Sequence, residues 1–360
     1  MECLFKQLER GLLALLVLAV CGCSRLGTKV SNPLLQMFPS TSRISPRGEL
    51  GLEQYDVLEV NGIKAYKDCF LMKTNNSETG FCLLNLQDDK VLKFFNKGRG
   101  KGEFSYFRSF EIQDDTMWVA DPNLRRLYAF DLKNVVAGDF SSLVEQRPIE
   151  KPDGHMGMYM PIQMIPTKYG FLAFGYMGGT SWYSLLGKGG EVLGQVGLPD
   201  FAATENFSVF DKEYIGSTSY CSVHPDGDRM VCAMLNADAI SFASIGNGTL
   251  SEYKRYILSE PPVEMVDGKV AHRKDATHSF FCACSNEKSV FLLYSGKPIL
   301  GGDTPVSECT ELLEFNWDGE PVKRYILNET ICGLCFQGNT LYGCTSYPGA
   351  KIYVYDLQRQ

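Results

Sequence analysis

The stretch that decides the fold is Leu-Leu-Glu-Phe-Asn-Trp-Asp-Gly-Glu-Pro-Val, at residues 312–322. Apolar and polar side chains alternate up to Asn316, and a second short strand-like segment begins at Val322. Alternation over a few residues predicts a β-strand, and Asp-Gly between two such segments predicts a tight reversal of the chain. The stretch therefore predicts two antiparallel strands joined by a turn.

The same pattern, a short apolar strand that ends in Asn or Asp or at a Gly-rich turn, recurs along the chain. Its further copies lie at residues 81–95, 127–132 and 352–357, with weaker ones at 182–196 and 240–258. Lys-Arg-Tyr-Ile-Leu even recurs verbatim at 254–258 and 323–327. Six copies over about 310 residues give about 50 residues per unit, the spacing typical of propeller blades.

One four-stranded unit cannot bury both of its faces, so neighbouring units must stack, and a closed ring covers the ends. Between the copies lie hairpins such as residues 220–233, whose His224-Pro-Asp-Gly turn suits a chain reversal. The last unit lacks a fourth strand, whereas residues 53–60 resemble a strand without a unit. We therefore predict an all-β, six-bladed propeller over residues 50–360, with its ring closed by this N-terminal strand pairing with the last blade.

The N-terminus has the pattern of a signal peptide. Lys6 and Arg10 precede an apolar run of about ten residues, which is too short to cross a bilayer. The following Val20-Cys-Gly-Cys23 resembles the lipobox of bacterial lipoproteins, in which the signal is removed and the Cys is lipidated. We predict a signal peptide at residues 1–22 and lipidation of Cys23. The alternative is an ordinary secretory signal that contains two cysteines.

Residues 23–49 are rich in Ser, Thr, Pro and Gly and carry no acidic residue before Glu49. Such a stretch buries too little apolar surface to offset the entropy of ordering, so it is predicted to be a flexible tether. We expect a cell-envelope protein that contacts the membrane through its lipid. The acidic residues typical of a surface-export signal do not follow Cys23, which leaves the periplasmic side of the outer membrane and the cell surface open.

A Gly-rich segment after the first unit suggests a family. It comprises Gly98, Arg99, Gly100, Gly102, Glu103 and Phe104, with Lys101 among them. Together with the lipobox and the His-Pro-Asp-Gly turn, it resembles the TolB-like six-bladed β-propeller lipoproteins of anaerobic gut bacteria. There Gly-Arg-Gly-Pro-Gly-Glu-Phe commonly follows the first blade. The resemblance implies the fold and an envelope location but no activity, because the family has no settled one. The segment lacks the ending of a phosphate-binding loop, so it is predicted to be a structural crossover.

Composition excludes some functions. The chain of 360 residues is 44% hydrophobic and 21% charged, as expected for a folded protein. Its net charge of −7, from 35 basic and 42 acidic residues, argues against a nucleic-acid partner, which would need a basic face.

Of the thirteen cysteines, ten follow Cys23, and we predict that most are free and buried. The pairs that could bridge neighbouring strands are Cys69 with Cys82, Cys221 with Cys232 and Cys335 with Cys344. Cys332 and Cys335 have the spacing of a redox motif but lie on a predicted strand rather than at a helix start.

No metal site or cofactor is predicted, because the four His show no ligand spacing. Methionines at 156, 158, 160 and 164, beside His155, would suit a soft ion only if their thioethers converged. Met also fills irregular gaps in protein cores, which is the simpler interpretation.

Tyr176, Trp182 and Tyr183 flank a Gly-rich loop, and their flat faces would suit contact with a sugar or a peptide. The alternative is that Trp182 and Tyr183 open a strand and pack between blades. No catalytic signature is present, so no catalytic residue is assigned.

We predict a non-catalytic module that binds a glycan or a protein partner through loops on one face and the mouth of the channel. The alternatives are a channel-centred enzyme, a polysaccharide lyase or hydrolase, and a structural subunit of an envelope complex. If the protein is an enzyme, we expect His, Tyr, Arg and acidic side chains with shifted pKa values in the channel. If it is a binding protein, we expect an aromatic or apolar patch, and if it is a structural subunit, we expect a broad flat face.

Overall fold

The computed structural model describes residues 32–74, 79–88, 90–96, 98, 103–108, 110–139, 143–150, 159–246 and 248–357. The chain forms two compact units, residues 1–37 and 38–360. In the first unit, α2 (Pro33–Gln36) begins after Asn32, whose side chain accepts hydrogen bonds from the backbone N–H groups of Leu34 and Leu35. The second unit contains every strand.

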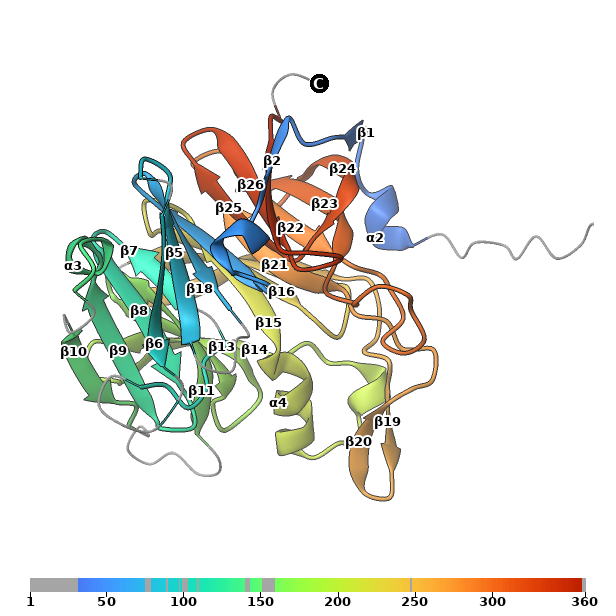
Figure 1. Cartoon of the computed structure of the whole chain (residues 1–360). Helices are drawn as coiled ribbons and strands as arrows, with labels where there is room; N and C mark the ends of the chain where they lie inside the picture. The colour runs from blue at the N-terminus through green and yellow to red at the C-terminus, as the bar shows by residue number, and fades with distance from the viewer. Residues whose placement is uncertain are drawn as a thin grey trace, which may run out of the picture. The chain divides into compact units, whose positions relative to one another are not determined.

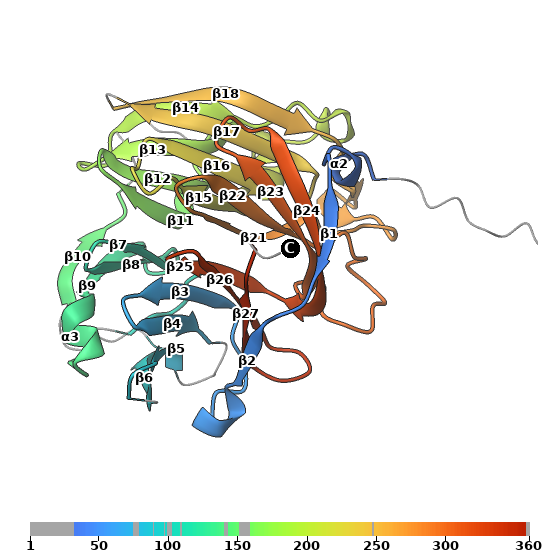
Figure 2. The same ribbon diagram turned by 90° about the horizontal axis from the view of Figure 1, so that it is seen from above.

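The second unit is a six-bladed propeller, which confirms the predicted fold (Figures 1 and 2). The first three blades, from the channel outwards, are β3 (Gly62–Tyr66), β4 (Cys69–Lys73), β5 (Thr79–Asn85) and β6 (Lys90–Asn96); β7 (Phe110–Gln113), β8 (Thr116–Asp121), β9 (Arg126–Asp131) and β10 (Leu143–Pro148); and β11 (Met160–Thr167), β12 (Gly170–Tyr176), β13 (Ser181–Gly187) and β14 (Val192–Gly197). The last three are β15 (Ser219–Val223), β16 (Arg229–Met234), β17 (Ala239–Gly246) and β18 (Thr249–Ile257); β21 (Phe280–Ser285), β22 (Ser289–Tyr294), β23 (Cys309–Asn316) and β24 (Pro321–Ile331); and β25 (Gly333–Gln337), β26 (Thr340–Thr345), β27 (Lys351–Tyr355) and β2 (Gly48–Gly51).

The ring is closed by β2, which pairs antiparallel with β27 from Gly48 opposite Val354 to Gly51 opposite Lys351. Closure by an N-terminal strand is as predicted, but the assignment of that strand to residues 53–60 is wrong. That segment begins with the short 3-10 helix η1 (Glu53–Tyr55) and continues without forming a strand. Val57 and Val60 of this segment, with the preceding Leu52, are buried by packing between the last and first blades, whereas Leu58 is 68% exposed.

The predicted tether at residues 23–49 is also too long. Strand β1 (Thr41–Ile44) runs parallel to β24 at the outer edge of the fifth blade, and Ile44 is only 1% exposed. Residues 41–51 therefore belong to the propeller rather than to a flexible tether. The stretch Thr-Ser-Arg-Ile of β1 contains a single apolar residue, so it gave no strand pattern. The predicted signal peptide and Cys23 lie outside the described residues.

Aromatic side chains fill the seam between the first and second blades. Phe81 stacks on Phe107 with ring centroids 4.5 Å apart, and Phe104 packs edge-on against Tyr128 at 4.8 Å. Both faces of a blade are thus covered by its neighbours, which is why the strands carry apolar residues on both sides.

The two ends of the ring differ. Because successive strands in a blade alternate in direction, the connections between blades all fall at one end, which we call the insertion face. It carries η2 (Ala202–Thr204) and α4 (Val209–Ser217) before β15, and the hairpin of β19 (Val263–Val266) and β20 (Lys269–His272) before β21. Figure 1 shows α4, β19 and β20 together at this end. The opposite end, the hairpin face, carries the turns from first to second strand and α3 (Leu132–Val136).

Removing β1 and β2 by starting the chain at Leu52, rather than at Asn32, is expected to lower the stability of the propeller. Burial of one side chain such as Ile44 contributes about 1.5–3 kcal/mol, and β27 would lose its ladder partner. A loss of at least about 3 kcal/mol corresponds to a fall in melting temperature of roughly 6–12 °C. Calorimetry on the two chains measures it, and equal melting temperatures would contradict ring closure by β2.

Candidate functional site

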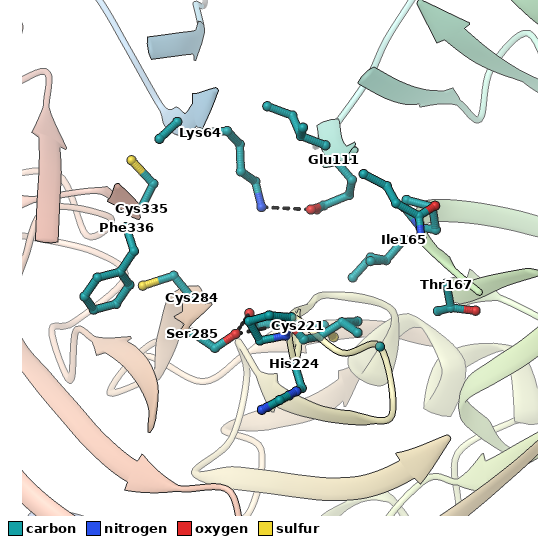
Figure 3. Close-up of a pocket in the computed structure, with 18 of the residues that line it drawn as sticks. Lys64, Glu111, Ile165, Thr167, Cys221, His224, Cys284, Ser285, Cys335 and Phe336 are labelled. Atoms are coloured by element: carbon teal, nitrogen blue, oxygen red, sulfur yellow. Dashed lines mark hydrogen bonds and ion pairs between the residues drawn. The ribbon is translucent and has the colours of Figure 1, made fainter. Parts of the chain in front are cut away.

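A cavity of about 390 Å³ opens at the hairpin face of the central channel (Figure 3). The first strands of all six blades contribute to its wall. One lining residue from each blade in turn is Lys64, Glu111, Ile165, Cys221, Cys284 and Cys335. We call this cavity the chamber.

A smaller pocket of about 80 Å³ lies toward the insertion face, lined by the starts of first strands such as Gly62, Phe110 and Gly333. We call it the mouth pocket. Lys64 and Glu111 line both cavities, so they lie in the wall where the chamber and the mouth pocket meet.

An ion pair joins the first two blades at this level. Lys64 Nζ lies 2.8 Å from Glu111 Oε2, and Gln163 Nε2 of the third blade donates to Glu111 Oε1 at 3.3 Å. Burial alone would lower the pKa of Lys64, but the charge of the Glu111 carboxylate and its hydrogen bond raise that pKa above its ordinary value. Lys64 therefore stays protonated at neutral pH, and Glu111 is engaged by two donors.

Five cysteine thiols line the two cavities: Cys221, Cys282, Cys284, Cys332 and Cys335. Burial raises the pKa of Cys282 to about 11 and that of Cys284 well above its usual range. The pKa of Cys332 is also raised, mainly by its contact with Cys344 and further by burial. All ten cysteines in the described residues are free, as predicted.

His224 belongs to its turn, as expected from the sequence. Its carbonyl accepts from the N–H of Gly227, and its Nδ1 accepts from the N–H of Asp226 at 3.0 Å. Gly227 has a φ of 70°, the left-handed conformation that glycine tolerates best. Beside this turn, the hydroxyls of Ser222 and Ser285 hydrogen-bond at 2.8 Å across two blades.

The mouth pocket is lined by positive charge and aromatic rings. The guanidinium carbon of Arg108 lies 4.9 Å from the centre of the Tyr220 ring. This contact links the loop before β7 of the second blade to β15 of the fourth. Lys73 Nζ donates to the carbonyl of Arg108 at 2.7 Å. Phe281 lies next to Tyr220, with ring centroids 6.2 Å apart.

The model of the TolB-like 6-blade propeller-like family matches residues 71–339, well over half of the chain. The chain belongs to this family. The match runs from the second strand of the first blade to the first strand of the last, so the closing strand lies outside it. A search of curated proteins finds no relative by sequence.

Solved structures share the fold of this TolB-like propeller. A Bacteroides fragilis protein that is named as exported has a TM-score of 0.52 at 10% identity, covering 88% of this chain and 98% of its own. A DUF4221 family member from Bacteroides vulgatus has a TM-score of 0.51 at 9% identity, covering 86% and 96%. A gluconolactonase from Xanthomonas campestris has a TM-score of 0.49 at 11% identity, covering 85% and 89%. At these identities the similarity concerns the fold alone.

The Gly-rich family segment is a structural connection where it is described. The N–H of Gly98 donates to the carbonyl of Phe104 at 2.8 Å, and Phe104 is buried in the aromatic seam. The Glu103 carboxylate packs directly against Gly98, in the space that a side chain at this position would occupy. Arg99, Gly100 and Gly102 lie outside the described residues.

The predicted ligand contacts Tyr176, Trp182 and Tyr183 do not form an exposed surface. Trp182 and Tyr183 are 0% exposed, and their polar atoms bond to Ser219 and Ser241 of the fourth blade at 2.8 and 2.7 Å. Tyr176 is 8% exposed and stacks on Phe210 of α4 at 5.0 Å. The alternative interpretation holds, because β12 and β13 are buried on both sides between blades.

The structure does not test whether the methionines near His155 converge on a metal ion, because residues 155–158 lie outside the described residues. Met164 is 8% exposed and packs in a core cluster. The described ranges contain no group of three or more His, Cys, Asp or Glu that could hold a metal ion. Nor is any helix in them long and apolar enough to cross a membrane.

Sequence analysis missed Lys64, Glu111, Arg108 and Tyr220, because they come from different blades. A signal did exist: Lys64 and Glu111 are single charged residues inside short, otherwise mostly uncharged first strands. Such a residue on the innermost strand of a propeller points into the channel or pays a burial cost.

Double-mutant analysis of Lys64→Met and Glu111→Gln is expected to give a coupling free energy of about 1–2 kcal/mol. The value falls below that of a fully buried pair because the Lys64 side chain keeps 33% exposure to the channel. Urea unfolding of the wild type, both single variants and the double variant measures it. Additive losses would show that the pair does not stabilise the channel.

His278 gives a pH-dependent stability. Its ring lies 5.7 Å from that of Phe281, and burial, with a smaller effect of His272, lowers its pKa to about 4. The unfolded chain takes up this proton near pH 6.5, whereas the folded chain resists it. The stability that neutral His278 provides is therefore complete above pH 6.5 and lost as the pH falls toward 4.

We expect the free energy of unfolding of the wild type to fall between pH 6.5 and 4.5 by more than that of His278→Gln. Urea titrations of both proteins at several pH values measure this difference. Parallel pH profiles for the wild type and His278→Gln would contradict a lowered pKa.

Proposed function

We propose that this protein is a lipid-anchored, extracytoplasmic binding protein whose propeller channel holds a saccharide without changing it chemically. The observation that carries the proposal is the protonation state of the channel. A nucleophilic thiol needs a lowered pKa, and a general base must face the atom whose proton it removes. The pKa values of the channel thiols and of Lys64 are raised, and Glu111 is held by Lys64 and Gln163.

The chamber suits a small polar ligand. Its volume of about 390 Å³ falls in the range of small-molecule sites, whereas a protein partner would need a broad surface. Hydroxyls of Thr167, Ser222 and Ser285 line it beside the apolar side chains of Ile165 and Phe336. This mixture of hydroxyls and apolar surface matches the two faces of a sugar ring.

The envelope location rests on the predicted signal peptide and the predicted lipidation of Cys23. The Bacteroides fragilis protein that shares the fold is named as exported, which supports an extracytoplasmic site of action.

The test is thermal melting of the purified full-length protein against a panel of neutral and acidic glycans. A bound glycan at about one hundred times its dissociation constant adds about 2.7 kcal/mol and raises the melting temperature by several degrees. Ser285→Phe, which fills the chamber, is expected to abolish the shift, while Lys288→Phe in the adjacent exposed turn retains it. Mass spectrometry of the recovered glycan should show it unchanged.

Conversion of the glycan by the wild type, lost in Ser285→Phe, would replace the proposal with the channel-centred enzyme. A shift that persists in Ser285→Phe would place the ligand elsewhere. No shift with any glycan would leave a protein partner or a structural role as the function.

A further inference from the structure

We infer that the mouth pocket binds the carboxylate of an acidic saccharide, with Arg108 as its anchor. The inference rests on the proposed function and names the chemical class of the ligand and the end of the channel where its charged group lies.

The charge of the mouth pocket is opposite to that of the chain. Three cationic side chains line it, Lys64, Lys73 and Arg108, against the single carboxylate of Glu111. Because Glu111 pairs with Lys64, this carboxylate does not balance the charge that Arg108 adds to the pocket. The chain as a whole has a net charge of −7, so this local excess of positive charge is not a general property of the surface.

The guanidinium of Arg108 is oriented but not neutralised. It lies over the Tyr220 ring, and no carboxylate among the described residues pairs with it. A guanidinium presents five N–H donors in a planar fork that matches the two oxygens of a carboxylate. The contact with the face of the Tyr220 ring leaves the N–H groups at the edge of the guanidinium for a ligand.

The backbone that carries Arg108 is fixed before any ligand arrives. The buried carboxylate of Asp121 accepts from the N–H groups of Ser105 and Tyr106 at 2.6 and 3.1 Å, and Lys73 Nζ donates to the Arg108 carbonyl at 2.7 Å. A preorganised donor loses little conformational entropy on binding, so its hydrogen bonds contribute more fully to affinity.

The size of the pocket and its aromatic rings favour a saccharide over an inorganic anion. A volume of about 80 Å³ accommodates two or three waters or one carboxylate group, but not a whole sugar. The ring that bears the carboxylate would then remain at the opening, against the half-buried Tyr220 and Phe281. Aromatic faces provide apolar contact that phosphate or sulfate would not use.

The experiment compares trigalacturonate with its trimethyl ester by calorimetric titration of the full-length protein. The two probes share one sugar backbone, and the ester replaces each carboxylate by a neutral methyl ester. We expect the acid to bind at least about ten times more tightly than the ester, with an affinity that falls as salt is added.

Arg108→Gln is expected to raise the dissociation constant for the acid by about 10- to 100-fold, and Arg108→Lys by less, because it keeps the charge without the fork. Arg273→Gln is the matched control, since Arg273 is exposed and does not line the pocket. A melting temperature of Arg108→Gln close to that of the wild type establishes that the variant is folded.

Equal affinity for acid and ester, or unchanged binding by Arg108→Gln, would overturn the inference. Tighter binding of an Asp-Glu peptide than of trigalacturonate would overturn the saccharide assignment. If neither probe binds while a neutral glycan still stabilises the wild type and not Ser285→Phe, this inference fails and the proposed function stands. If no glycan binds at all, both fail.

Discussion

The pairing of β2 with β27 is the constraint on which the channel depends. The last blade supplies only three strands from the C-terminal end of the chain, and β2 completes it from the other end. This pairing leads directly into residues 52–60, whose buried side chains pack between β27 and the first blade. The first strands of the six blades can converge on one axis only in a closed ring, so Lys64 of the first blade and Cys335 of the last face each other through this closure.

Buried carboxylates fix the loops of the insertion face by accepting hydrogen bonds from them. Asp121 accepts three backbone N–H groups, and Glu308 accepts from the Thr345 hydroxyl and the Ser346 N–H. Glu213 of α4 accepts from the N–H of Gly179. A carboxylate that is removed from water must gain several donors to offset its dehydration, so each of these residues fixes the backbone that surrounds it. The position of Arg108 is one consequence.

Local patterns predicted the blades because each strand pair is encoded by neighbouring residues, as in residues 312–322. Local patterns failed where contacts with distant parts of the chain determine the secondary structure. β1 has one apolar residue and is a strand because it pairs with the edge of β24. Residues 53–60 resemble a strand in sequence, but Val57 and Val60 are buried by packing between blades rather than by strand pairing. Trp182 and Tyr183 carried no local signal that distinguishes a ligand contact from an inter-blade core. The candidate site could not be read from sequence, since Lys64, Arg108, Gln163 and Tyr220 come from different parts of the ring.

The ion pair between Lys64 and Glu111 divides the channel electrostatically as well as sterically. Because the two charges of the pair offset each other, the pair adds no net charge to the channel wall, and the positive charge of Arg108 acts at the mouth pocket. An anionic group is therefore attracted to the insertion face, where it can keep part of its hydration, rather than drawn into the channel. Without Glu111, Lys64 would extend the positive charge inward, and a carboxylate would lose more water to reach it. In the proposed complex, the pair that keeps Lys64 protonated would also set the depth to which a charged ligand enters.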